Sequence, residues 1–148
     1  MYSNLADILE QDGAVARIAA DCQEVVSSEL SSKSGVSAAA LKVAYKAVTT
    51  FAPGYYQTTV ESMVPNLLHE LQPFWADFHA AGGGVFGDYL GKRGEEVTEA
   101  VLSVTDDMTE GSDHPTIVKA YKAVRGSAGP HIEAALPAVG ALVEKYAA

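Results

Sequence analysis

Four histidines, one cysteine and a glycine-rich segment are the groups in this chain that could support chemistry. His69-Glu70 begins like a zinc-protease helix, but Pro73 stands where the second histidine belongs. His69, Asp77 and His79 could converge if Pro73 folded the chain back. Solvent-facing side chains are the commoner explanation, because a metal needs three or four supported ligands. We therefore expect no metal site.

The remaining motifs predict no catalysis either. Gly82–Gly87 matches the G-x-G-x-x-G dinucleotide loop, but that loop needs a preceding strand, and here an aromatic helix precedes it. Cys22 lies in an apolar helix stripe, where burial makes a thiol inert. Arg125 stands where a serine-hydrolase elbow would begin with glycine. We expect no catalytic residue and no cofactor; an enzyme is not excluded but is disfavoured.

The elements that position these residues are helices nearly everywhere. Apolar residues recur at spacings of three and four, and no run alternates with period two. The sequence predicts an all-α, single-domain multi-helix bundle over residues 1–148, with apolar stripes in six segments: Val15–Leu30, Leu41–Phe51, Val60–Leu71, Val97–Met108, Ile117–Val124 and Ile132–Tyr146.

Polar and special residues predict where these helices begin, end and bend. Asp12, Ser37 and Asp113 are the expected amino-terminal caps. Gly35 is expected to end the first long helix in a left-handed conformation, and Pro65 to kink or restart the third.

An internal repeat suggests how the bundle is built. The pentapeptide Ala44–Val48 recurs identically as Ala120–Val124, an offset of 76 residues. Chance is the alternative, because alanine is abundant and amphipathic helices resemble one another. We interpret the repeat as a duplication that gives two three-helix units, residues 12–72 and 88–147, packed around one core.

The junction between the units, residues 73–87, contains the only tryptophan and three consecutive glycines. Large rings beside flexible backbone suit a ligand site or a subunit contact. They also suit a plug that seals the units together, which we favour because aromatics at helical spacing are usually core. The candidate interface or ligand-site residues here are Phe74, Trp75, Phe78, His79, Phe86 and Tyr89.

The net charge and the hydropathy of the chain disfavour two classes of binding partner, nucleic acids and membranes. Nineteen acidic residues against ten basic ones give a net charge of -9, which disfavours nucleic acid. We see no signal peptide and no apolar segment long enough to span a bilayer, so we expect a cytoplasmic protein with no membrane partner. Basic faces on the two repeated helices could bind an acidic partner or a second copy, although ordinary solvated helix surface is the explanation that we favour: Lys42, Lys46, Lys119, Lys122 and Arg125.

Several segments resemble a family of small uncharacterised proteins from actinobacteria: Ser32–Gly35, Pro73–Phe78, Gly82–Gly84, Phe86–Leu90 and Leu102–Asp106. The resemblance spans almost the whole chain. It implies an intracellular bacterial protein with a domain of unknown function, and it brings no known activity and no catalytic residue.

Two functions remain. The first is a non-enzymatic protein that acts through self-association or association with another protein. The alternative is a binding module for a small apolar or amphiphilic ligand at the junction of the two units.

Overall fold

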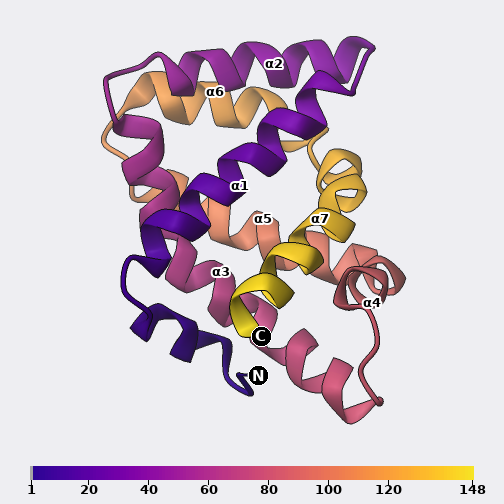
Figure 1. The fold of residues 1–148 in the computed structure, drawn as a ribbon. Coiled ribbons are helices and arrows are strands. Elements are labelled where there is room, and N and C mark those ends of the chain that lie inside the picture. The colour runs from indigo at the N-terminus through magenta and orange to yellow at the C-terminus, as the bar shows by residue number, and fades with distance from the viewer. Residues whose placement is uncertain (1) are drawn as a thin grey trace.

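The computed structural model describes residues 2–148, which form eight helices and no strand. This confirms the prediction of an all-α, multi-helix fold (Figure 1). The amide of Tyr2 donates to the carbonyl of Ala147 at 2.8 Å, so the two ends of the described chain lie together. In chain order the helices are η1 (Leu5–Glu10, a 3-10 helix), α1 (Ala14–Ser31), α2 (Val36–Thr49), α3 (Tyr55–Ala80), α4 (Phe86–Lys92), α5 (Gly94–Glu110), α6 (Pro115–Arg125) and α7 (Gly129–Ala147).

The longest helix, α3, corrects the expected boundaries of the junction. It runs through both Pro65 and Pro73 without ending, and the exposure of both prolines lets water solvate the backbone carbonyls that each ring leaves without a donor. Pro65 therefore starts no new helix, and Pro73 does not fold the chain back. The predicted junction, residues 73–87, is instead the last two turns of α3, a glycine loop and the start of α4.

The expected caps were also wrong. The helices α1, α2 and α6 are preceded by Gly13, Gly35 and His114, not capped by the side chains of Asp12, Ser37 and Asp113. Gly35 introduces α2 with a φ of 102° and does not terminate α1, which has already ended at Ser31.

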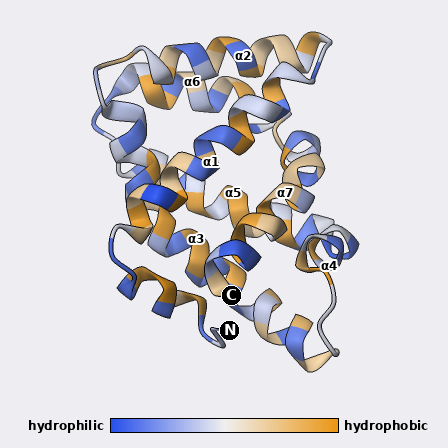
Figure 2. Ribbon diagram, in the orientation of Figure 1, coloured by the Kyte–Doolittle hydropathy of each residue, from blue (hydrophilic) through white to orange (hydrophobic). Residues whose placement is uncertain are grey.

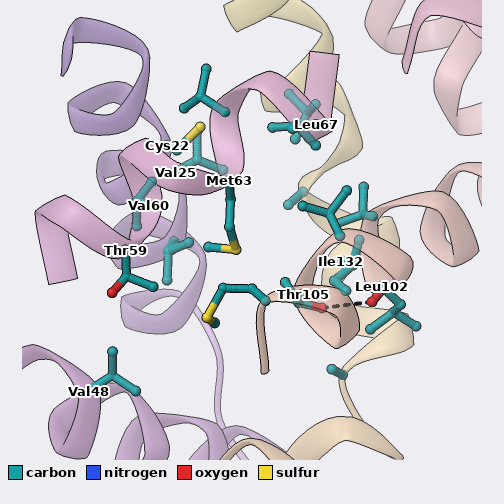
Figure 3. Close-up of a pocket in the computed structure, with 18 of the residues that line it drawn as sticks. Cys22, Val25, Val48, Thr59, Val60, Met63, Leu67, Leu102, Thr105 and Ile132 are labelled. Carbon is teal, nitrogen blue, oxygen red and sulfur yellow. Dashed lines mark hydrogen bonds between the residues drawn. The ribbon is translucent and has the colours of Figure 1, made fainter. Parts of the chain in front are cut away.

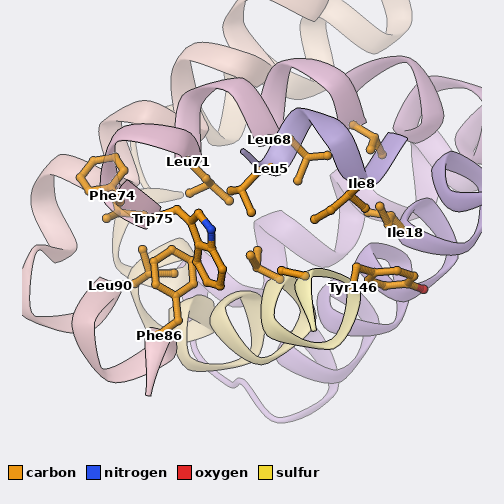
Figure 4. Packing of buried hydrophobic residues seen from close by; sticks show 14 of the residues in the cluster. Leu5, Ile8, Ile18, Leu68, Leu71, Phe74, Trp75, Phe86, Leu90 and Tyr146 are labelled. Carbon is orange, nitrogen blue, oxygen red and sulfur yellow. The ribbon is translucent and has the colours of Figure 1, made fainter. Parts of the chain in front are cut away.

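The tightly packed core lies where η1, α3, α4 and α7 meet, at the bottom of Figure 1. Figure 4 shows Trp75 at its centre, with Leu5, Leu71 and Phe86 around it. The indole Nε1 donates to the carbonyl of Tyr2 at 2.9 Å, which satisfies the one polar atom of a side chain that is 1% exposed. This core fixes the N-terminal segment, which the sequence assigned to no element.

The opposite end of the molecule is a layer of two helices, α2 and α6, which carry the repeated pentapeptides (Figure 1). They pack chiefly on each other, and the only fully buried residue in α2 is Ala38. Phe51, just after α2, contacts His114, just before α6, with ring centroids 4.9 Å apart, so the end of α2 lies beside the start of α6. This α2–α6 layer covers the ends of α1, α3, α5 and α7. We call the layer the roof of the molecule and the four helices beneath it the walls.

Candidate functional site

The structure places most of the predicted aromatic site in the core. Phe74, Trp75, Phe78 and Phe86 are buried. The Phe86 ring centroid lies 4.9 Å from that of Trp75 and 5.1 Å from that of Phe78. The rings join α3 to α4 and leave almost no aromatic surface to a ligand.

The other two residues of that predicted site are half-buried. His79 packs edge-on against Trp75 at 4.3 Å, and Tyr89 accepts a hydrogen bond from Arg93 at 3.0 Å. The Arg93 guanidinium also lies 4.6 Å from the centre of the Phe74 ring and pairs with Asp77 at 3.0 Å. These contacts occupy Tyr89 and Asp77, whereas the Nε2 atom of His79 is buried and has no hydrogen-bond partner among the described residues.

The histidines of α3 do not assemble with acidic residues. His69 and Asp77 are exposed, and Asp77 is engaged by Arg93. Within residues 2–148 no group of three or more histidine, cysteine, aspartate or glutamate side chains could hold a metal ion.

A cavity of about 420 Å³ lies beneath the layer formed by α2 and α6. Six helices line it: α1, α2 and α3 from the first predicted unit, and α5, α6 and α7 from the second. Its volume falls within the range of small-molecule sites, which is about 300–1,000 Å³. The cavity therefore lies between the helices of the two predicted units. It extends from the α2–α6 layer toward the aromatic cluster, because Leu71, which packs beside Trp75, also lines it.

Aliphatic and sulphur-containing side chains form the walls. Figure 3 shows Cys22 and Val25 of α1 facing Met63 of α3, with Leu102 of α5 and Ile132 of α7 on the other side. Thioethers are flexible and polarisable, so a methionine wall adapts to ligands of different shape. Most of the lining is apolar, with a few hydroxyl groups.

The roof is built from the inner faces of the two repeated helices. Tyr45 of α2 and Tyr121 of α6, which occupy the same place in the repeated pentapeptide, are both half-buried and both line the cavity. The Tyr45 ring packs edge-on against Tyr56 of α3 at 5.7 Å. Because Tyr45 and Tyr56 both belong to the lining, this contact helps to join roof and wall.

One polar cluster marks the edge of the cavity beneath α6. The Tyr121 hydroxyl donates to Asp106 at 2.5 Å and lies 2.7 Å from the Thr105 hydroxyl. Arg125 donates twice to the same carboxylate, at 2.9 and 3.2 Å. Arg125 and Tyr121 hold the pKa of Asp106 below its ordinary value, so the carboxylate is ionised at neutral pH. Only Thr105 and Tyr121 of this cluster reach the lining.

Two titratable groups on the cavity wall, Cys22 and Tyr56, are neutral at physiological pH. Burial, with a smaller contribution from the charge of Asp21, raises the pKa of the Cys22 thiol to about 11. Burial also raises the pKa of Tyr56 to about 12, with Tyr45 adding to the effect. A protonated thiol is a poor nucleophile, so Cys22 contributes apolar surface to this site.

Sequence reasoning missed this site because its residues are the ones assigned to a packed core. Val25, Leu41 and Val48 lie in the predicted apolar stripes, yet the structure leaves them half-buried around a cavity. Helical periodicity gives the direction of a side chain but not whether another side chain meets it.

Comparison with known proteins places the chain in a family. No curated protein and no solved structure matches it. A family model, described as a family of unknown function, matches residues 5–147, which include every helix described above. This match confirms the expected domain of unknown function: the chain belongs to the family of unknown function DUF6918.

Proposed function

We propose that this protein binds a small apolar or amphiphilic molecule in the cavity between the helices of its two predicted units. The observation that carries the proposal is the cavity itself, about 420 Å³ with an almost wholly apolar lining. Close-packed interiors leave few voids larger than a water molecule, because every void forgoes dispersion contacts. A cavity of this size is costly to stability, and a binding function explains why the fold keeps it.

The lining favours a ligand with little charge. Cys22 and Tyr56 are neutral, and the one carboxylate at the edge, Asp106, is already paired with Arg125. A charged group placed among the aliphatic walls would lose its hydration without a partner. A hydroxyl or other neutral polar end could exchange hydrogen bonds with Tyr121 and Thr105, which would orient an amphiphile with its tail toward Met63.

The cavity makes ligand binding the better supported of the two proposed functions, although from the sequence we favoured association of the protein with itself or with another protein. The aromatic rings that motivated a subunit contact are largely buried within the chain, whereas the cavity is a recess that a ligand can enter. Exposed surface that could serve association lies on the outside of α2 and does not compete with the cavity.

The test uses N-phenyl-1-naphthylamine, a neutral apolar dye that fluoresces when it leaves water. We expect saturable binding to the folded protein, and native mass spectrometry of gently purified protein should detect retained adducts. Ala44→Phe places a ring in the cavity from α2 and should weaken dye binding at least tenfold.

Ala39→Phe is the matched control, because Ala39 is exposed on the opposite side of the same helix. If Ala44→Phe does not fold by circular dichroism, Ala135→Leu makes a smaller change from α7. Equal binding by the cavity variants and Ala39→Phe, or no saturable binding by the wild type, would refute the proposal.

A further inference from the structure

The outer surface of the α2–α6 layer has a charge opposite to that of the whole protein. These two helices contain five of the ten basic residues and none of the nineteen acidic ones. Lys42, Lys46, Lys119 and Lys122 are all exposed. Arg125, the fifth, is engaged with Asp106 of α5. In a chain of net charge -9, this layer is a local cationic surface.

The same layer carries the two most exposed large apolar side chains among the described residues. Val36 is 91% exposed and Val43 is 71% exposed, and both lie on α2. Their separation of seven residues places them on one side of the helix, where Ala40 and Ala47 share the same stripe. The cavity-lining residues Leu41, Tyr45 and Val48 lie on another side of α2. This helix is therefore apolar on its outer face as well as its inner one, with lysines beside the outer stripe. Figure 2 shows hydrophobic and hydrophilic residues interspersed along α2.

We propose that the outer face of the α2–α6 layer docks on an anionic lipid bilayer surface. Lysines beside an exposed aliphatic stripe are the combination by which a helix lies in a membrane interface. The cytoplasmic leaflet of a membrane attracts each such lysine, and the attraction falls off within a Debye length. No helix of residues 2–148 is long and apolar enough to cross a membrane. From the sequence we expected no membrane partner, because no apolar segment is long enough to span a bilayer. Docking on the surface of a membrane requires no such segment.

A bilayer fits this face better than an acidic protein or the acidic surface of a second copy. The exposed cations are all lysines, which are hydrated point charges on flexible stems and suit mobile headgroups. Fixed carboxylates on a protein are usually paired by arginine, and the arginine of this layer is turned to Asp106 within the chain. The valines add short apolar side chains that can enter the headgroup region.

Docking would also place the cavity roof against the bilayer. Tyr45 and Tyr121 line the cavity from the same two helices whose outer faces carry the lysines. A lipid-derived ligand could then pass between membrane and cavity by movement of this layer alone. This link rests on the proposed function, whereas the docking itself does not.

Vesicle flotation with the full-length protein tests the docking. We expect it to float with vesicles of phosphatidylcholine containing 30% phosphatidylglycerol, not with phosphatidylcholine alone, and to dissociate at 0.5 M NaCl. Lys46→Glu and Lys122→Glu should each weaken binding at least about fivefold. Lys92→Glu, the same charge change at an exposed lysine of α4, should have little effect.

A second pair of variants tests the aliphatic stripe. Val43→Ser should weaken binding to the anionic vesicles, whereas Val85→Ser, at an exposed valine in the loop before α4, should not. None of these residues lines the cavity, so all five variants should still bind N-phenyl-1-naphthylamine if the proposed function holds. A cavity that binds no dye would leave the flotation result untouched.

Four outcomes would overturn the docking proposal. They are no flotation with anionic vesicles, equal flotation with neutral ones, equal losses for Lys46→Glu and Lys92→Glu, and capture of the protein by soluble polyglutamate without flotation. Polyglutamate capture would indicate an acidic protein partner. A dimer that Lys46→Glu dissociates, in a protein that does not float, would indicate a second copy instead and would equally exclude the bilayer.

Discussion

Gly87 of α4 and Gly140 of α7 bring the backbones of two helices into direct contact. A Cβ on Gly140 would overlap the backbone N and Cα of Gly87, and one on Gly87 would lie 2.8 Å from the carbonyl oxygen of Pro137. Only two facing glycines permit this approach, and it seats Phe86 in the core beside Trp75.

Gly140→Ala should therefore be strongly destabilising. The added methyl group meets backbone, which cannot rotate away, so α4 must move off α7; we expect a loss of about 3 kcal/mol in the free energy of unfolding. Gly91→Ala is the control, because nothing beyond its own helix lies within 4 Å of the place that a Cβ would take there, and it should stabilise α4 by roughly 0.5–1 kcal/mol. Urea denaturation measures both, and similar values for the two variants would contradict the close approach.

Trp75 should report a dry environment at every protein concentration. Its side chain is 1% exposed and its Nε1 is hydrogen-bonded to Tyr2, so emission should be blue-shifted and poorly quenched by acrylamide. Trp75→Ala should cost about 3–5 kcal/mol, as removal of buried aromatic rings does. Emission that moves to longer wavelength on dilution would show that a subunit contact, not the chain itself, shields the indole.

Cys22 should react slowly with thiol reagents at neutral pH. Burial raises the pKa of Cys22 to about 11. The rate of labelling with iodoacetamide should therefore still rise about tenfold per pH unit at pH values where an ordinary thiol is already fully ionised. The chain unfolded in urea provides the control and should level off about two pH units earlier. Bound N-phenyl-1-naphthylamine should slow the reaction further, since Cys22 lines the cavity. A rate that levels off equally early in folded protein would disagree with the environment described.

The protein should lose stability in alkali through two tyrosines. Burial, followed by the hydrogen bond to Asp21 at 2.6 Å, raises the pKa of Tyr146 to about 12, and burial raises that of Tyr56 to about 12. The folded state holds these protons more tightly than the unfolded chain, so their contribution is complete below pH about 10 and is lost as pH rises toward about 12.

Urea unfolding at about pH 9 and pH 11 measures this loss. Tyr146→Phe and Tyr56→Phe should each reduce the difference between the two conditions, and the double variant should reduce it most. Since Cys22 titrates in the same direction, some alkaline loss should remain. An unchanged loss in the double variant would show that other groups dominate.

The helical class and most of the helices could be predicted from the sequence, because the period of apolar residues is a local property. Stripes such as Ile117–Val124 fix which side of a helix faces inward. The signals at helix ends were weaker: Ser37 and Asp113 have the chemistry of caps, but neighbouring residues introduce the helices, and Pro65 and Pro73 remain within α3. Local preferences of this kind are worth about 1 kcal/mol at a cap, and tertiary packing can override them.

Whether an apolar residue lies in the core, beside the cavity or on the surface depends on contacts between distant segments. Trp75 and Tyr121 both lie in amphipathic helices, yet one is sealed by η1 and α4, and the other borders a cavity. The difference comes from segments distant in sequence: Tyr2 satisfies the indole of Trp75, and Gly140 lets Phe86 reach it. Whether an apolar face is filled depends on the shapes that meet it from other helices, and one-dimensional spacing carries no information about that fit.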